Sequence, residues 1–427
     1  MSDIFFNPYP ARFVDPNEPG LIAAYTFADG ELAQWGKYIN RARTGAAYDL
    51  TTRQATPMIG YNGGLLGNRA APFGSWWRGV VVPVGNVNFS YMMEHVEDAV
   101  ATGFVCVAVN GVAHSFWTTN TGHVGCSFQG GVTSETPWNV AGRGLARYDA
   151  LYDGTNQILV VNGRIADQDA VAPAALGANL DIGQHGEETL VKVYSVRRTV
   201  AEARVSYVRE MAKVVVAHWQ PAAVGEGPAG GLVTGQCLDE FTCPLGGATL
   251  KFEYSRVLNG LALTDSGALS ARRIQYAGAS RPFFGSYKNK YVVRSNAIGG
   301  DNPLISFYNV RDADFTTGVT AQAYTTGASN VAGSWATVLY RNATVLLTVN
   351  SPLPANNSIC ETLFSRHPSG DMRLYSKING IWYGSPVTVA NDVTYLNTSL
   401  IGIAPRGSYV GEITCFQGEM ESQELNQ

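Results

Sequence analysis

The sequence predicts an all-β protein of two tandem antiparallel β-sandwiches, with a short helix closing the first. The chain has 427 residues, which suits two domains of about 200 residues each. Charged residues make up only 15%, while 47 Gly and 21 Tyr favour strands and turns over solvated helices. Short apolar runs, punctuated by Gly, Asn and Pro, recur along the whole chain, as sandwich strands do.

Composition divides the chain into four segments. Residues 1–18 are rich in proline and follow neither a helical nor a strand period, which predicts an extended N-terminal arm. Residues 19–219 are assigned to the first sandwich and residues 245–427 to the second. Between them, residues 220–244 are rich in Gly and Pro and are interpreted as a linker.

One segment departs from the strand pattern. Residues 199–217 have helical apolar spacing, and Thr199 with Glu202 matches a capping box, in which each residue satisfies a backbone donor of the other. The pattern predicts the short helix that closes the first sandwich.

The two halves of the chain end alike, at residues 182–204 and 401–425. Each end begins with Ile-Gly, passes through a polar turn and enters a strand of alternating apolar residues. In each, a glutamate lies eight residues after an aromatic residue of that strand, which indicates an internal repeat. Glu202 follows Tyr194 in the first copy, and Glu424 follows Phe416 in the second.

These endings resemble the C-terminal signature of laminin-G/concanavalin-A-like domains, a late strand followed by a polar turn and a small helix. Gly20–Gly30 is similar to the opening strand of that family, and Ala146–Ala166 to its central hairpin. Asp153-Gly154 and Asn162-Gly163 supply the positive φ that tight hairpin turns need. Met372–Gly384 mirrors the hairpin in the second half. The resemblance implies a concanavalin-A-like jelly roll in both halves.

No catalytic constellation is visible, and we expect no enzymatic activity. Retaining glycosidases need two carboxyl groups about 5–5.5 Å apart, and the chain has no Glu-x-Asp-x-Glu strand that would supply them. The nearest acidic cluster, Glu94–Asp98, is interpreted as a solvated strand face. A polysaccharide depolymerase that uses this cluster is the alternative.

The sequence predicts no cofactor. The resemblance implies a site for one Ca²⁺ in a loop at the rim of a sandwich, and whether this chain has that site is left open. The candidate oxygen ligands are Asp29, Asp49, Asp153 and Asp181. The six histidines lack the close pairing of a metal triad, and His114 and His123 are interpreted as isolated structural residues.

The six cysteines form no CxxC pair, so a cysteine zinc site is not expected. Cys106 and Cys415 lie in apolar runs and are interpreted as buried small hydrophobes. Cys237 and Cys243 are close enough in sequence for a loop disulfide, and whether that bond forms is left undecided.

Carbohydrate binding would use exposed aromatic side chains that stack on sugar rings. Packing in the core or at an interface is the alternative for each such residue. The candidates are Trp76, Trp77, Trp117, Trp382 and Tyr383.

The remaining expectations concern location and partners. The chain shows no secretory signal and no apolar run long enough to cross a bilayer, and its net charge of -4 gives no reason to expect nucleic acid. We predict a bacteriophage virion protein, assembled in the host cytoplasm as a capsid decoration or a head or tail fibre component. It would form a homo-oligomer and contact a host-surface glycan. Phe5, Phe6 and Tyr9 would dock the arm to other virion proteins, unless the arm straps its own domain. A soluble carbohydrate-binding module is a further alternative.

Overall fold

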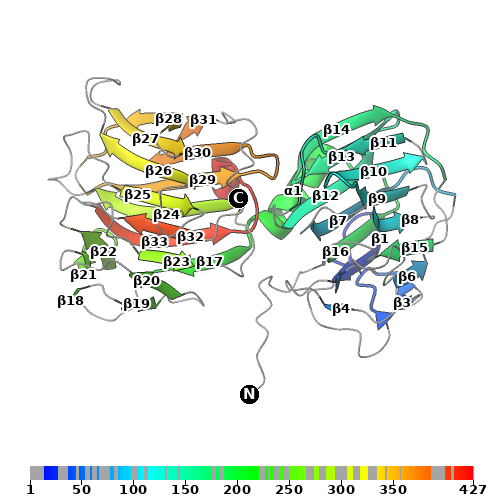
Figure 1. Cartoon of the computed structure of the whole chain (residues 1–427), viewed down its shortest axis with the longest axis horizontal. Coiled ribbons are helices and arrows are strands. Elements are labelled where there is room, and N and C mark those ends of the chain that lie inside the picture. The colour runs from blue at the N-terminus through cyan, green and yellow to red at the C-terminus, as the bar shows by residue number, and fades with distance from the viewer. Residues whose placement is uncertain are drawn as a thin grey trace, which may run out of the picture. The chain divides into compact units, whose positions relative to one another are not determined.

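The computed structural model describes most of the chain from residue 14 to residue 426 (Figure 1). Some strand residues are described by their backbone alone. The described ranges are 14–26, 37–44, 48–52, 58–59, 65–66, 77–80, 85–97, 104–109, 114–129, 132–141, 145–175, 179–182, 187–220, 227–228, 231–234, 240–243, 250–265, 274–277, 285–293, 305–310, 318–325, 334–341, 344–355, 357–385, 400–404 and 408–426.

The predicted fold class is confirmed. The protein is all-β, and its strands form antiparallel sheets that pair into two sandwiches. The chain divides into two compact units, Met1–Met211 (unit 1) and Ala212–Gln427 (unit 2). No helix among the described residues is long and apolar enough to span a membrane.

Unit 1 consists of sheets A and B. Sheet A holds, in spatial order, β14 (Arg164–Ala170), β13 (Asn156–Val161), β12 (Leu145–Tyr152), β7 (Ser90–Val96), β16 (Glu187–Tyr194), β5 (Leu65–Leu66) and β4 (Met58–Ile59), with β1 (Leu21–Thr26) beside β16. Sheet B holds β11 (Val132–Glu135), β10 (Val124–Gln129), β9 (His114–Thr118), β8 (Phe104–Val109), β15 (Asn179–Ile182), β6 (Trp77–Val80), β3 (Leu50–Thr52) and β2 (Lys37–Tyr38).

Unit 2 consists of sheets C and D. Sheet C holds β31 (Ile381–Ser385), β30 (Met372–Ile378), β29 (Ile359–Arg366), β24 (Ser286–Val293), β33 (Ser408–Phe416), β22 (Gly260–Asp265), β21 (Leu250–Ser255) and β18 (Gly227–Pro228), with β17 (Val215–Trp219) beside β33. Sheet D holds β28 (Thr344–Pro352), β27 (Ser334–Arg341), β26 (Gly318–Thr325), β25 (Ile305–Val310), β32 (Leu400–Ala404), β23 (Ile274–Ala277), β20 (Glu240–Cys243) and β19 (Gly231–Thr234).

The core of unit 1 lies between its two sheets. Tyr91 and Met93 of β7 pack with Phe116 and Phe128 of sheet B in one buried apolar cluster. The Tyr91 hydroxyl donates to the Ser127 carbonyl oxygen at 2.6 Å, which satisfies its polar end inside the core. Because side chains alternate along a strand, the neighbouring residues of β7 point to the opposite, outer face of sheet A.

The strand order of unit 2 repeats that of unit 1. Sheet A runs β14-β13-β12-β7-β16-β5-β4 and sheet C runs β31-β30-β29-β24-β33-β22-β21, each with one extra strand beside its β16 or β33. Sheets B and D match in the same way. The internal repeat predicted from the two chain ends is therefore a repeat of the whole sandwich topology.

The register fixes which residues correspond. Ser90 lies opposite Tyr194 in unit 1, and Ser286 lies opposite Phe416 in unit 2. Both serine hydroxyls donate to a carbonyl oxygen two residues after that aromatic residue, at 3.1 and 2.7 Å. Each of the closing strands, β16 and β33, also carries one β-bulge against its central strand, at the corresponding place.

The two glutamates of the predicted repeat, Glu202 and Glu424, both accept a hydrogen bond from a backbone N–H at the start of a helix. The Glu202 carboxylate accepts from the Thr199 backbone N–H at 2.7 Å, which completes a capping box on α1 (Val200–Tyr207). The Glu424 carboxylate accepts from the Glu421 backbone N–H at 2.7 Å, at the start of the 3₁₀ helix η6 (Ser422–Asn426).

The predicted helix is too long and needs correction. After α1 the chain forms one π-helical segment, η3 (Val208–Ala212), and then enters strand β17. The β-branched run at residues 214–216 explains this change, because such side chains favour strands over helices. Val215 pairs with Phe416, so this segment belongs to sheet C.

The boundary between the halves also differs from the one assigned by composition. Unit 2 begins at Ala212, so β17 leaves the segment 19–219 and joins the second sandwich. Within 220–244, the described residues form β18, β19 and β20, which pair with other strands of unit 2. The described part of this stretch is therefore strand of the second sandwich rather than connector.

Candidate functional site

Charged and aromatic side chains form a row across sheet C. Lys290 of β24 lies opposite Glu412 of β33 and Glu361 of β29. Glu361 in turn lies opposite Lys377 of β30, and Lys377 lies opposite Trp382 of β31. Residues directly opposite one another in an antiparallel pair share a face, so this row lies on one face of the sheet.

The row is on the outer face, away from sheet D. Tyr291, the neighbour of Lys290, is fully buried, and its hydroxyl lies near the buried Trp335 of β27 in sheet D. Alternation along β24 therefore directs Lys290 outward.

A cavity of about 590 Å³ opens on this face. Its size falls in the range typical of ligand sites, about 300–1,000 Å³. Its lining mixes charge, amides and apolar groups, which suits a ligand with both hydroxyl groups and apolar ring faces. The lining includes the charged Lys290, Glu361 and Lys377, the amides Asn357 and Asn379, and the apolar Val257 and Ile359.

Two contacts hold Lys377 in place in the lining of this cavity, which we call the groove. The Lys377 Nζ lies 3.3 Å from the Glu361 Oε1, and both side chains keep about a fifth of their surface exposed. The same Nζ lies 5.2 Å from the centroid of the Trp382 ring, which is half-buried. The ion pair and the cation–π contact therefore hold Trp382 against Lys377, which lines the cavity.

A tight hairpin places Lys377 and Trp382 opposite each other. Asn379 and Gly380 both have positive φ, 51° and 83°, as a two-residue hairpin turn requires. A Cβ added to Gly380 would meet no atom within 4 Å, so the turn has open space around it.

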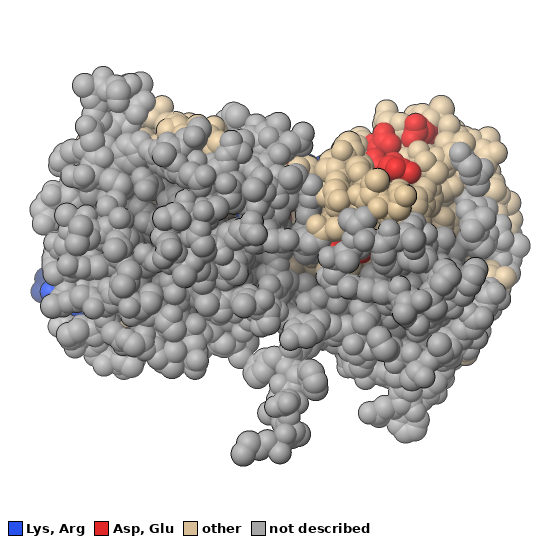
Figure 2. All heavy atoms as spheres, viewed as in Figure 1, with Lys and Arg blue, Asp and Glu red and all other residues tan. Residues whose placement is uncertain are grey.

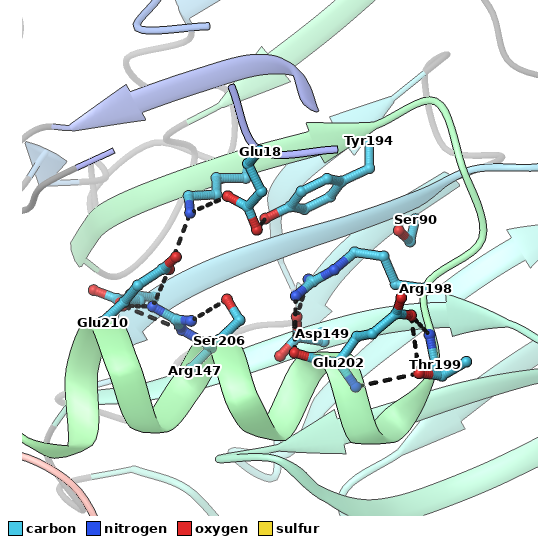
Figure 3. Close-up of polar contacts among 12 residues, drawn as sticks. Glu18, Ser90, Arg147, Asp149, Tyr194, Arg198, Thr199, Glu202, Ser206 and Glu210 are labelled. Carbon is cyan, nitrogen blue, oxygen red and sulfur yellow. Dashed lines mark hydrogen bonds and ion pairs between the residues drawn. The ribbon is translucent and has the colours of Figure 1, made fainter. Parts of the chain in front are cut away.

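The corresponding face of unit 1 is closed. The Arg147 guanidinium, fully buried, donates to Glu94 at 2.6 Å and to Ser206 of α1 at 3.1 Å, and Nη2 lies 3.1 Å from Glu210 of η3 (Figure 3). The register makes Glu94 the counterpart of Lys290 and Arg147 the counterpart of Glu361, so the charges of this cross-strand pair are exchanged between the units.

The ion network continues to the N-terminal segment. Lys192 of β16 has a fully buried side chain, and its Nζ donates to Glu210 at 2.9 Å and to Glu18 at 2.8 Å. The other oxygen of Glu18 accepts from the Tyr194 hydroxyl at 3.0 Å (Figure 3). Burial on its own would raise the pKa of Glu210, but Arg147 and Lys192 outweigh it and hold that pKa well below its ordinary value.

Helix α1 also covers sheet A through apolar contacts and through its contact with a hairpin turn. Ala203 of α1 packs on Leu151, Ile158 and Val160 of sheet A. A Cβ added to Gly163, in the Asn-Gly turn of unit 1, would lie 2.5 Å from the Arg204 side chain of α1. The Asn-Gly turn that is open in unit 2 is thus covered by the helix in unit 1.

Unit 1 also buries a histidine between two carboxylates. The His95 Nε2 lies 3.4 Å from Glu97, and its Nδ1 lies 3.4 Å from Glu188, with all three side chains at 1% exposure or less. Burial alone would lower the pKa of His95, but Glu188 and Glu97 raise it to about 9. The histidine is therefore a buried cation at neutral pH.

The acidic cluster proposed for a depolymerase is not a solvated strand face. Glu94 is completely buried and bound to Arg147, and Glu97 is buried beside His95. Asp98 lies outside the described residues. Glu94 is buried because Ser206 of α1 and Glu210 of η3 close over its partner Arg147, which strand alternation does not indicate.

The aromatic candidates are not gathered in one place. Trp382 contacts Lys377 of the cavity lining in unit 2, whereas Tyr383, its neighbour on β31, points to the other face of the strand. Trp117 is half-buried on the outer face of sheet B in unit 1, where its ring lies over Gly125. Trp77 lies in β6, and only its backbone is described. Trp76 lies outside the described residues.

The arm residues Phe5, Phe6 and Tyr9 lie outside the described residues. So does Cys237, while the side chain of Cys243 is not described, and the disulfide question stays open. Cys415 is fully buried, as predicted.

The metal candidates have separate roles. His114 and His123 each approach a different backbone carbonyl oxygen, of Ala175 and Thr136. Asp153 accepts two backbone N–H groups in its own turn, Asp49 accepts one from Asn40, and Asp29 is outside the description. Asp181 lies buried in β15. Within the described part of the chain, no group of three or more His, Cys, Asp or Glu could hold a metal ion.

Sequence reasoning missed Lys290, Glu361 and Lys377. The signal was present: lysines alternate with other residues in Ser286–Val293, which is the pattern of a strand with one polar face. The partner strands that place these three residues side by side are far apart in the sequence, so the groove follows only from the register.

A second polar surface lies elsewhere on unit 1. Acidic atoms gather near the β14 edge (Figure 2). β14 supplies Asp167 and Asp169, which accept from the Glu135 backbone N–H at 2.9 Å and the Ser134 hydroxyl at 2.7 Å. These contacts tie the edges of sheets A and B together, which accounts for both carboxylates.

Comparisons with known proteins give the following. No protein-family model matches the chain, and no curated protein matches it. Among solved structures, the chain is similar to a botulinum neurotoxin type C structure described as dependent on two ganglioside molecules for cell entry (8% identity, 90% of this chain, 98% of that chain, TM-score 0.38). It is also similar to domain 4 of a GH43 arabinanase from Geobacillus stearothermophilus in complex with arabinotriose (13%, 44% and 98%, 0.33).

A Trypanosoma rangeli sialidase is a further similar structure, at 12% identity and a TM-score of 0.30, over 47% of this chain and 36% of that chain. At these identities and TM-scores the neighbours carry no argument about the function of this chain.

Proposed function

We propose that this protein is a non-enzymatic adhesive protein that binds a cell-surface glycan in the groove on the outer face of sheet C. The observation that carries the proposal is the half-buried Trp382, held by Lys377 beside an open cavity of about 590 Å³. Sugar binding commonly combines an aromatic platform with charged and amide groups that bond hydroxyls.

The groove supplies both kinds of contact. The paired Lys377 and Glu361 offer a donor and an acceptor whose positions are fixed by each other. The Asn357 and Asn379 side chains are exposed at the rim, where each amide offers two donors and one acceptor oxygen. Ile359 and Val257, each 37% exposed, add apolar surface.

A glycan array tests the proposal. We expect the full chain to bind a subset of glycans, and Trp382→Ala to weaken that binding by about 10-fold or more, equivalent to about 1.4 kcal/mol. Trp117→Ala, which removes an aromatic ring from unit 1, is the matched control and leaves binding unchanged. Loss of binding in both variants, or in neither, contradicts the assignment to the groove.

The wider proposal places this adhesive role in a bacteriophage particle, with laminin-G/concanavalin-A-like sandwiches presented by a homo-oligomer. It is supported by the sequence alone, through the proline-rich arm and the absence of a catalytic pattern. Co-sedimentation with an assembled particle tests it and separates it from a soluble carbohydrate-binding module. Deleting residues 1–13, which leaves Glu18 bound to Lys192, tests the docking role of Phe5, Phe6 and Tyr9.

The enzymatic alternative has its own test. A depolymerase would shorten a glycan that the protein binds, and size analysis of the glycan after incubation would detect this. We expect the bound glycan to keep its length. Cleavage that is lost in Glu361→Gln would replace the adhesive proposal with an enzymatic one.

A further inference from the structure

Lys290 differs from the other lysines of its sheet face. Lys377 pairs with Glu361 at 3.3 Å and Lys288 with Glu412 at 3.7 Å. Lys290 lies in register between Glu361 and Glu412, yet within the described part of the chain its Nζ forms no ion pair with either. Both neighbouring carboxylates are already engaged by other lysines.

This free ammonium lines the cavity. Lys290 is half-buried, and with Lys377 it gives the groove lining two positive charges against the single negative charge of Glu361. A cation on the wall of a partly desolvated groove attracts a negatively charged ligand group more strongly than one on a flat surface.

The comparison between units points the same way. The counterpart of Lys290 in unit 1 is Glu94, which is fully buried and satisfied by Arg147 at 2.6 Å. In unit 2 the position carries the opposite charge, no protein group compensates it among the described residues, and the face is open.

We infer that the groove recognises an acidic saccharide, with the carboxylate or sulfate of one sugar bound to Lys290. This rests on the proposed glycan-binding function and adds the ligand class. The Lys377–Glu361 pair and the amides of Asn357 and Asn379 then bond the hydroxyls of that sugar and its neighbour. No proton or bond is transferred, so the interaction is binding alone.

Isothermal titration of the full chain with three tetrasaccharides tests this. The probes are galacturonate, its carboxyl-reduced neutral form, and a sulfated galactan of the same length. We expect at least one acidic probe to bind about 10-fold more tightly than the neutral one, with the preference shrinking as salt rises from about 0.05 to about 0.5 M. The two acidic probes decide between carboxylate and sulfate.

Variants assign the preference to the residue. Lys290→Met removes the preference for the acidic probe over the neutral one, while Lys290→Arg retains that preference. Lys251→Met, at an exposed lysine of β21 outside the cavity lining, is the matched control and changes nothing. A circular dichroism melt checks that each variant is folded.

The outcomes separate the two proposals. Equal binding of acidic and neutral probes, or an acidic preference that survives in Lys290→Met, overturns the inference and leaves glycan binding intact. Binding of none of the three probes, together with no binding on the array, overturns both.

Discussion

The two units share one strand order but treat the same sheet face in opposite ways. In unit 1, α1, η3 and Glu18 cover sheet A, and the cross-strand pair Glu94–Arg147 is fully buried. In unit 2, the corresponding Lys290 and Glu361 line an open cavity. The covering element, rather than the sheet, decides whether a charged pair holds the fold together or faces a ligand.

The difference follows from the segment after the closing strand. In unit 1 this segment is an eight-residue helix continued by a π-helical stretch, and it brings Ser206 and Glu210 onto Arg147. In unit 2 it is the five-residue 3₁₀ helix η6. Just before η6, Glu419 and Glu421 pair with Arg373, away from the groove.

Breaking the charged pair in each unit gives the largest expected difference. Arg147→Ala removes the buried cation that pairs with Glu94, so we expect the free energy of unfolding of unit 1 to fall by about 3–5 kcal/mol. Glu361→Ala removes a partly exposed partner and costs less than about 1 kcal/mol in unit 2. Hydrogen exchange of β7 and β24 peptides in urea measures both. Equal losses would contradict the contrast between a closed and an open face.

Alkaline pH sharpens the comparison. The pKa of His95 is raised from its ordinary 6.5 to about 9 in the folded chain, so its contribution to stability is complete below about pH 6.5 and is lost as pH rises through about 9. The shift corresponds to about 3 kcal/mol. Its counterpart in unit 2 is Tyr291, whose buried hydroxyl has a raised pKa and stays neutral over this range.

We therefore expect exchange protection of β7 to fall between pH 7 and 10 while that of β24 holds, after correction for the intrinsic exchange rate. His95→Gln removes the pH dependence of β7. A decline of the same size in both strands would indicate a general alkaline effect and not the buried histidine.

The helix caps give the smallest difference. Glu202→Ala and Glu424→Ala each leave one backbone N–H unsatisfied, so we expect each to cost about 1 kcal/mol. Only Glu202→Ala is expected to loosen the buried network, because α1 carries Ser206 and leads into η3. Thermal melts of the two variants, with exchange of β12 peptides, measure this. Loosening of β12 by Glu424→Ala would go against the account.

Local patterns carried much of the fold. The alternating runs, the Asn-Gly turn at Asn162 and Asn379, and the spacing of Glu202 from Tyr194 all predicted features that the structure has. They depend on neighbouring residues, which a single sequence displays. The length of the helix was wrong because pairing of Val215 with a strand about 200 residues away outweighs the local helical spacing.

The candidate site was less accessible from the sequence. Trp382 was singled out as an aromatic residue, but its partner Lys377 and the free Lys290 depend on registers between strands distant in the chain. Glu94 appeared solvated because a charged residue in a strand usually faces water. Its burial requires knowing that Arg147 and Glu210 meet it under α1.

Lysine labelling tests the central claim most directly. Brief acetylation of the native chain, followed by mass spectrometry, compares Lys192 under the cover of unit 1 with Lys290 in the groove of unit 2. We predict that Lys290 is modified within the pulse and that Lys192 reacts only when the chain is unfolded. Rapid modification of Lys192, or protection of Lys290 to the same degree, would contradict the account.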